Sequence, residues 1–318
     1  MRRAAALAFI PLLAVAAIAG CGSSSSSKPA AAPDTYKSVT VSGTFGKSPT
    51  VSIPKLTASG PLYTKTLIQG TGATVTSADG VVGNYVAYDW AGKTSKLLGS
   101  TFTQGSPSLF VGGQMISGVQ KALVGQKIGS RVLAVVPPAD GLGAQATSAG
   151  IGTSDTLVFV IDLDSEFSLV SVPGKQTASG GGALPTVVAP ASGTVGPTVN
   201  INTKATPPKD LQVKTVIKGA GPVVKKGDNI VVNYNGYIWR TGKSFQSSWA
   251  HPNQPFQTPI GEGAVIKGWD TGLVGQTMGS RVLLVIPPAQ GYGSAGSSQA
   301  GIKGTDTLVF VVDILAAS

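Results

Sequence analysis

The feature that most constrains the fold of this chain is an internal repeat. LVGQKIGSRVLAVVPPADGLG at residues 123–143 recurs as LVGQTMGSRVLLVIPPAQGYG at 273–293, and DTLVFVIDL at 155–163 recurs as DTLVFVVDI at 306–314. The period of about 150 residues is longer than that of solenoid repeats and matches the size of an ordinary domain. The repeat therefore predicts two tandem copies of one domain.

Weaker echoes upstream set the boundaries of the two copies. KTLIQGTG recurs as KTVIKGAG, and SGTFGKSPTVSI recurs as SGTVGPTVNI. We expect copy one to span residues 39–166 and copy two to span 190–318, with a Gly-rich linker over 167–189.

Most of each copy has the pattern of β-structure. In copy two, residues 229–237 alternate polar and apolar side chains, and 281–286 and 306–315 are apolar runs rich in β-branched residues. Only 265–274 places apolar residues three and four positions apart, as on one face of a helix. One short helix against several antiparallel strands predicts an α+β fold.

The composition excludes several classes of site. The chain has one cysteine, Cys21, and one histidine, His251, so neither an internal disulfide nor a Cys/His zinc site can form. Because His251 lies in a turn-like Ala-His-Pro-Asn stretch, a Ser-His-Asp triad is not expected either. The net charge is +10, but Lys and Arg are scattered and not interleaved with aromatic residues, which argues against nucleic-acid binding. We expect no metal and no cofactor.

The N-terminus is typical of an exported lipoprotein. Residues 1–20 have a basic start and an apolar core too short to span a bilayer comfortably. The Ile-Ala-Gly-Cys sequence that ends at Cys21 resembles the lipobox of bacterial lipoprotein signal peptides, which implies cleavage before Cys21 and acylation of its sulfur. Residues 21–38 suit a flexible tether. We therefore expect an extracytoplasmic protein held at the cell membrane by lipid on Cys21.

Six segments of copy two carry a family resemblance: VVNYNGY, GKSFQSS, PFQTPIGEGAVIKGW, GSRVLLVIPP, GYGSAG and DTLVFVVDIL. In this order and approximate spacing, they resemble the FKBP-type peptidyl-prolyl cis-trans isomerases. The resemblance implies a curved antiparallel sheet around a short helix, with a pocket between them that needs no cofactor. It also implies proline-containing exported polypeptides as substrates, and binding of macrolides of the tacrolimus type.

The resemblance assigns the pocket residue by residue. Trp269 would form the floor, and the amide of Ile266 and the hydroxyl of Tyr292 would bind substrate carbonyl groups. The catalytic residues so implied are Tyr234, Phe245, Gln246, Trp269, Tyr292 and Phe310, with Phe256, Val265, Ile266 and Ile302 binding the substrate.

Prolyl isomerisation suits such side chains. Resonance holds the X-Pro bond near planar with a barrier of about 18–20 kcal/mol. A twisted amide carries less separated charge than a planar one, so an apolar site favours the twisted state. No covalent bond is made or broken, so the reaction needs neither Cys nor His chemistry.

Two departures from the family pattern bear on activity. Gln246 stands where the family usually has Asp, so this position can form hydrogen bonds but carries no charge. Copy one differs at most pocket positions. We match Tyr88 with Tyr234, Phe159 with Phe310, Leu98 with Phe245, Pro107 with Phe256, Val119 with Trp269, Leu142 with Tyr292, and Met115-Ile116 with Val265-Ile266. We expect copy one to fold but to lack activity, with a pocket floor that drops or collapses at Val119.

These features favour one function over two alternatives. The main hypothesis is a membrane-anchored, extracytoplasmic prolyl isomerase that assists the folding of exported proteins. The first alternative binds proline-containing segments as a chaperone or scaffold without turnover. The second, a solute-binding lipoprotein, would need α/β domains with alternating helices, which this pattern does not predict.

Overall fold

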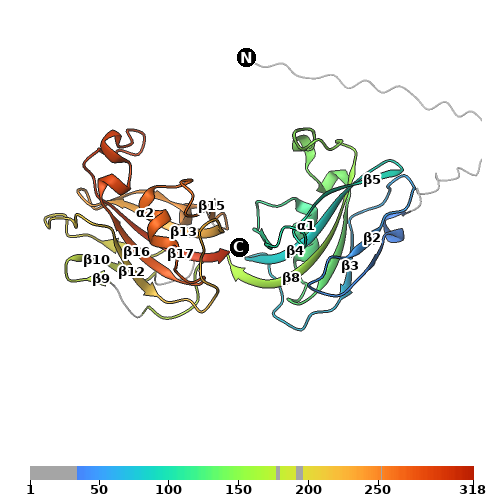
Figure 1. Cartoon of the computed structure of the whole chain (residues 1–318), viewed down its shortest axis with the longest axis horizontal. Helices are drawn as coiled ribbons and strands as arrows, with labels where there is room; N and C mark the ends of the chain where they lie inside the picture. Colours follow the sequence, from blue (N-terminus) through green and yellow to red (C-terminus); the bar gives the residue numbers. More distant parts are fainter. Residues whose placement is uncertain (1–33, 177–179, 191–195, 252) are drawn as a thin grey trace, which may run out of the picture. The chain divides into compact units, whose positions relative to one another are not determined.

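The computed structural model describes residues 34–176, 180–190, 196–251 and 253–318, so the predicted signal peptide and Cys21 lie outside it. Each copy forms a curved antiparallel sheet around one short helix (Figure 1). The α+β fold with two tandem copies is therefore confirmed. Neither helix of the described residues has the length and apolar character needed to cross a membrane.

The main sheet of copy two has the strand order β12-β16-β17-β13-β14, and β15 also pairs with β13. The strands are β12 (Gln212–Ile217), β13 (Asn229–Ile238), β14 (Lys243–Ser247), β15 (Phe256–Pro259), β16 (Arg281–Ile286) and β17 (Leu308–Ala317). The helix α2 (Lys267–Leu273) packs on the concave face of this sheet. It comes close because Gly268 has no side chain: a Cβ there would lie 2.5 Å from the Ile286 side chain.

Every residue of β16 is buried, because both faces of the sheet are covered. Val282, Leu284 and Ile286 belong to the core shared with α2. Leu283 and Val285 point to the opposite, outer face, where they pack with Val187 and Val199. A continuous apolar run in the sequence thus reflects two separate cores.

The cover of the outer face is a small sheet that precedes the main one. It has the order β11-β10-β9, with β9 (Gly180–Gly181), β10 (Leu184–Val188) and β11 (Thr198–Asn200). Two of these strands lie inside residues 167–189, which the sequence suggested as a linker. The Gly-rich composition suggested a linker, whereas this segment also contains apolar residues that pack on copy two.

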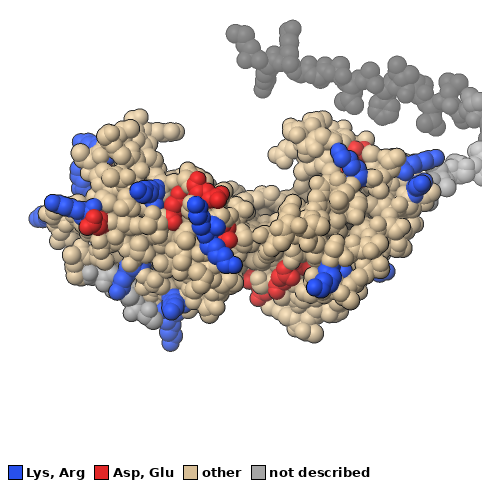
Figure 2. All heavy atoms as spheres, in the orientation of Figure 1, with Lys and Arg blue, Asp and Glu red and all other residues tan. Residues whose placement is uncertain are grey.

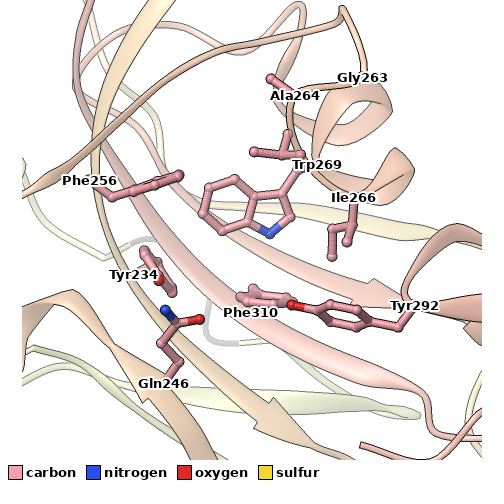
Figure 3. A pocket seen from close by; sticks show the side chains of 10 residues that line it. Tyr234, Gln246, Phe256, Gly263, Ala264, Ile266, Trp269, Tyr292 and Phe310 are labelled. Atoms are coloured by element: carbon pink, nitrogen blue, oxygen red, sulfur yellow. The ribbon is translucent and has the colours of Figure 1, made fainter. Parts of the chain in front are cut away.

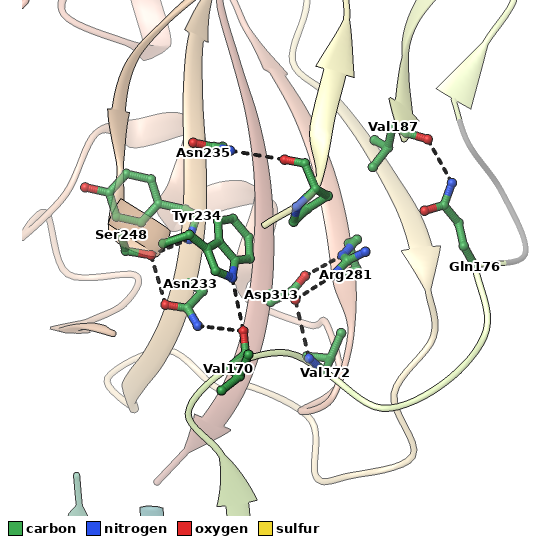
Figure 4. Close-up of polar contacts among 12 residues, drawn as sticks. Val170, Val172, Gln176, Val187, Asn233, Tyr234, Asn235, Ser248, Arg281 and Asp313 are labelled. Carbon is green, nitrogen blue, oxygen red and sulfur yellow. Dashed lines mark hydrogen bonds and ion pairs between the residues drawn. The ribbon is translucent and has the colours of Figure 1, made fainter. Parts of the chain in front are cut away.

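Hydrogen bonds attach residues 169–176 to the outer side of copy two (Figure 4). The Val170 carbonyl accepts from Asn233 Nδ2 at 3.1 Å and from Trp249 Nε1 at 3.0 Å. The Val172 amide donates to Asp313 Oδ2 at 3.4 Å. Asp313 is itself buried in a two-bonded ion pair with Arg281, at 2.6 and 2.8 Å. This stretch therefore behaves as part of the copy-two domain.

Copy one repeats the plan. Its main sheet has the order β3-β7-β8-β4-β5, with β6 paired to β4, and a hairpin of β1 and β2 precedes it. The elements are β1 (Thr40–Ser42), β2 (Thr50–Ser52), β3 (Tyr63–Ile68), β4 (Asp79–Ala91), β5 (Thr94–Ser100), β6 (Ser108–Phe110), α1 (Ser117–Leu123), β7 (Arg131–Val136) and β8 (Thr156–Ser168). The described residues of this echo, 42–53 and 196–201, lie in the pieces that cover the outer face in each copy.

The last five residues of the predicted tether, 34–38, belong to the copy-one fold. Tyr36 is 2% exposed, packs beside Trp90 and hydrogen-bonds through its hydroxyl with Thr156 Oγ1 at 2.9 Å. A buried aromatic residue with a satisfied hydroxyl does not act as a flexible spacer. The tether therefore ends earlier than the sequence indicated.

Candidate active site

A pocket of about 430 Å³ lies in copy two, between α2 and the concave face of the sheet (Figure 3). Its lining residues come from four strands, two loops and the helix: Tyr234, Gln246, Phe256, Gly263, Ala264, Val265, Ile266, Trp269, Tyr292 and Phe310. Eight of the ten residues that the family resemblance assigned to the pocket therefore lie together around one cavity.

The floor of the pocket is a set of perpendicular rings. Trp269 on α2 is 4% exposed, and its ring centroid lies 5.2 Å from Tyr234 and 5.4 Å from Phe310, at interplanar angles of 85° and 86°. Edge-to-face pairs of this kind are favourable beyond their buried area, since the positive edge of one ring meets the negative face of another. The helix and two sheet strands thus hold the floor rigid.

The indole nitrogen of Trp269 is buried and has no hydrogen-bond acceptor among the described residues. Figure 3 shows it on the edge of the indole that faces Phe310. The perpendicular packing of Phe310 against the indole, with centroids 5.4 Å apart, keeps this ring in place.

The mouth of the pocket is more open than its floor. Phe256 is 39% exposed and Tyr292 is 38% exposed, and Gln246 is also exposed. Phe256 remains in contact with the floor, since its centroid lies 5.9 Å from Tyr234 and 6.3 Å from Trp269. A polypeptide could therefore place one ring on the floor while its neighbouring residues remain at the surface.

None of the ten lining residues carries a charge at neutral pH. Burial, with a smaller contribution from Tyr292, raises the pKa of Tyr234 to about 12, so its hydroxyl stays protonated. The described residues also hold no group of three or more His, Cys, Asp or Glu side chains that could bind a metal ion. The chemistry available here is apolar contact together with neutral hydrogen bonds.

A carboxylate outside the lining shapes one rim. Asp270 Oδ1 accepts from the Gly261 amide at 2.7 Å, and Oδ2 accepts from the Gly263 amide at 2.8 Å. Both glycines have φ of +83°, a region that favours glycine. These two hydrogen bonds set the path of the chain into Ala264 and Ile266. The backbone amide of Ile266 has no acceptor among the described residues. Asp270 was not among the predicted site residues. Its position in the sequence, four residues after Ile266, was the available signal.

Two predicted pocket residues lie behind the lining. Phe245 packs perpendicular to Phe310, with centroids 5.7 Å apart. The pair fits because residue 236 is glycine: a Cβ there would lie 2.8 Å from each ring. Ile302 is 4% exposed in the copy-two core. These residues support the pocket walls and do not face the cavity.

Copy one has a pocket at the corresponding place, with a volume of about 360 Å³. It is lined by Tyr85, Ala87, Leu98, Gly99, Ser108, Phe110, Gln114, Met115, Ile116, Val119, Leu142, Ile151, Leu157 and Phe159. The floor has not collapsed at Val119, since Val119 lines an open cavity together with Phe110 and Met115. The aliphatic character of this lining is the main difference between the copies.

The tyrosine of the copy-one pocket is Tyr85, and the match of Tyr88 with Tyr234 was wrong. Tyr234 pairs with Val312, and Tyr85 pairs with the repeat-equivalent residue Ile161. Tyr88 lies three positions further along β4 and belongs to the cluster on the outer face. An odd shift along a strand moves a side chain to the other face of the sheet.

The match of Pro107 with Phe256 was also wrong. Phe256 pairs with Val232, and the corresponding pair in copy one joins Ser108 to Gly83. An aromatic ring still reaches the pocket, because Phe110 lies two residues further along the same face of β6. Its centroid is 5.9 Å from Tyr85, the same separation as between Phe256 and Tyr234.

Comparisons with known proteins place both copies in one family. The family model for FKBP-type peptidyl-prolyl cis-trans isomerases matches residues 73–164 and 221–315. The FK506-binding protein of Streptomyces anulatus is 40% identical over 110 residues, which cover 35% of this chain and 88% of that protein. A probable FK506-binding protein of Corynebacterium glutamicum is 37% identical over 110 residues, covering 35% of this chain and 89% of that protein.

Among solved structures, the crystal structure of the three FKBP domains of wheat FKBP73 is similar over 81% of this chain and 94% of that chain. Its sequence identity is 22% and its TM-score is 0.32. The family matches carry the assignment, since one falls in each copy and the Streptomyces protein is matched over most of its length. This chain therefore belongs to the FKBP-type peptidyl-prolyl cis-trans isomerase family.

Proposed function

We propose that copy two is the catalytic domain of a peptidyl-prolyl isomerase that acts on proline-containing segments of exported polypeptides. The observation that carries this proposal is the pocket of copy two, an aromatic box with an uncharged lining and hydrogen-bond donors near its mouth. A proline ring is apolar and compact, so it suits a floor made of Trp269, Tyr234 and Phe310.

Catalysis follows from what the box stabilises. A planar X-Pro amide is polar and prefers water, whereas the twisted amide has lost resonance and prefers apolar surroundings. The hydroxyl of Tyr292 and the amide of Ile266 are placed to hold the flanking carbonyl groups while the bond rotates. Each 1.4 kcal/mol or so of preference for the twisted state increases the rate about tenfold.

The test measures how fast the full chain isomerises a short Xaa-Pro peptide, with a protease-coupled or NMR assay. Trp269→Leu removes the floor, so it should lower kcat/KM by about a hundredfold, since an aromatic contact is worth a few kcal/mol. Val119→Leu, at the equivalent position of copy one, is the matched control and should leave the rate unchanged. A folded protein without rate enhancement would favour the binding-only alternative.

Competition by a macrolide gives a second readout of the same site. The bacterial relatives carry the name FK506-binding protein. We expect tacrolimus to inhibit the isomerase activity, and to lose affinity for Trp269→Leu but not for Val119→Leu.

For copy one we propose binding of apolar segments without turnover, as the first alternative function would require. Its pocket keeps a volume of about 360 Å³ but lacks the indole of Trp269 and the hydroxyl of Tyr292, replaced by Val119 and Leu142. An apolar chain can still be buried there, while the donor that would hold a twisted carbonyl is gone. Trp269→Leu should therefore lower turnover by the full chain about a hundredfold while an apolar peptide still binds to copy one.

We also propose that lipid on Cys21 holds the protein at the outer face of the cell membrane. The support is the Ile-Ala-Gly-Cys sequence and the basic and apolar residues before it. Cys21→Ala should leave the protein unprocessed or free of the membrane fraction. Processed Cys21→Ala protein that still sediments with membranes would refute the anchor.

A further inference from the structure

We infer that Gln246 is a specificity-determining residue that lets the copy-two pocket accept an acidic residue immediately before proline. This inference rests on the proposed isomerase function and names the substrate that suits this site. Three features of copy two carry it: a free amide at the mouth of the pocket, an uncharged lining, and a net positive charge of the whole copy.

The side-chain amide of Gln246 is unpaired within the described part of the chain. Its side chain forms no hydrogen bond with any described residue, and it points into the cavity opposite Trp269 (Figure 3). A primary amide has two N–H donors as well as an acceptor oxygen, whereas a carboxylate only accepts. Gln246 can therefore donate to an anionic oxygen of the substrate.

From its position at the mouth, Gln246 should contact the substrate residue that precedes proline. The buried floor has room for the proline ring, and the exposed mouth must receive the residues on either side of it. The carbonyl that twists belongs to the residue before proline, so the side chain of that residue leaves the pocket beside the mouth. Gln246 is then within reach of a Glu or Asp side chain at that position.

Two of the six carboxylates of copy two are paired with arginine, whereas its lysines are unpaired in the described part of the copy. Residues 196–318 contain eleven Lys and Arg against six Asp and Glu, a net charge of +5. Asp306 and Asp313 form ion pairs with Arg240 and Arg281, and Asp270 accepts two backbone amides. The nine lysines form no ion pair within the described part of this copy, where all nine are exposed.

Figure 2 shows Lys and Arg scattered over copy two, with a group of acidic side chains among them. The net charge of +5 attracts anionic segments at long range. No carboxylate lines the pocket: Asp270 at the rim is held by two backbone amides, and Glu262 beside it is exposed to solvent. An acidic residue before proline is therefore stabilised both at long range and at the mouth.

The test compares two tetrapeptides that differ only in Glu-Pro or Gln-Pro, which have the same shape and different charge. For the wild-type protein, the kcat/KM ratio of Glu-Pro to Gln-Pro should exceed one at about 20 mM salt and approach one at about 0.5 M salt. Gln246→Asp should lower this ratio about threefold at low salt, as expected for like charges some 6 Å apart in water. Gln246→Asn, which stays neutral, is the control and should keep the ratio above one.

A wild-type ratio below one, or the same ratio in Gln246→Asp, would overturn the inference while leaving the isomerase function intact. Dissociation constants of the same two peptides, measured by calorimetry, separate the two proposals. If neither peptide is isomerised, the isomerase proposal fails, and the ratio of the two dissociation constants still decides whether Gln246 admits the acidic side chain.

Discussion

Removing residues 167–189 should destabilise copy two, even though these residues lie outside the repeat. A fragment of residues 190–318 keeps the main sheet and β11 but loses β10 and the attached segment 169–176. It uncovers part of the outer face, where Leu283, Val285, Val309 and Val311 are at most 1% exposed. A fragment of residues 167–318 keeps this cover and is the matched control.

The size of the effect follows from what is uncovered. Exposing half of each of four aliphatic side chains costs about 1 kcal/mol each. The hydrogen bonds from Asn233, Trp249 and Val172 are lost as well. Each loss lowers the free energy of unfolding by about 1 kcal/mol if water does not replace the missing partner. A loss of about 5 kcal/mol is comparable with the whole stability of a typical domain.

Urea unfolding, followed by circular dichroism, measures this difference. With a slope of about 2 kcal/mol per molar urea, the midpoint of 190–318 should lie more than about 2 M below that of 167–318. Equal midpoints within about 0.5 M would refute the reasoning, because they would mean that the cover of the outer face contributes little to the fold.

Three further predictions concern the pockets. Since Tyr234 has a pKa of about 12 and no lining residue is charged, kcat/KM should be flat between about pH 5 and pH 9, and a bell-shaped profile would reveal an ionising group. Asp270→Asn leaves one acceptor oxygen for two amides, so KM should rise about tenfold, whereas Asp228→Asn, which frees an exposed turn, should not change it. Val119→Trp combined with Leu142→Tyr should give copy one measurable turnover in the Trp269→Leu background; no turnover would place its defect elsewhere, such as at Leu98 or Gly99.

The strands and helix near the pocket follow from local pattern. Arg281–Ile286 is an apolar β-branched run and forms β16, and residues 265–274, with helical spacing, contain α2. Eight pocket residues could be located because six motifs occur in family order, so an error in one segment does not shift the others. These assignments depend on short-range periodicity and on spacing, both of which the chain displays directly.

Assignments across strands were less secure. The match of Tyr88 with Tyr234 preserved residue type but slipped by three positions, and only the pairing of β4 with β8 places Tyr85 in the pocket. Phe245 and Ile302 have the residue types of a lining but lie behind it. Whether a ring lines the cavity or lies behind the lining depends on its neighbours. Gly236, for example, has no Cβ, which lets Phe245 pack against Phe310.

By itself, the amino-acid sequence determined the duplication, the α+β class, the chemical character of the copy-two pocket and the substitution at Gln246. Only the tertiary structure decided what covers the outer face of each sheet, which tyrosine of copy one lines its pocket, and that this pocket stays open at Val119. The reason is physical: periodicity records which side chains are buried, whereas the partner that buries them lies far away in the chain. For Leu283 that partner is a strand in a Gly-rich segment almost 100 residues earlier, whose composition alone resembled a linker.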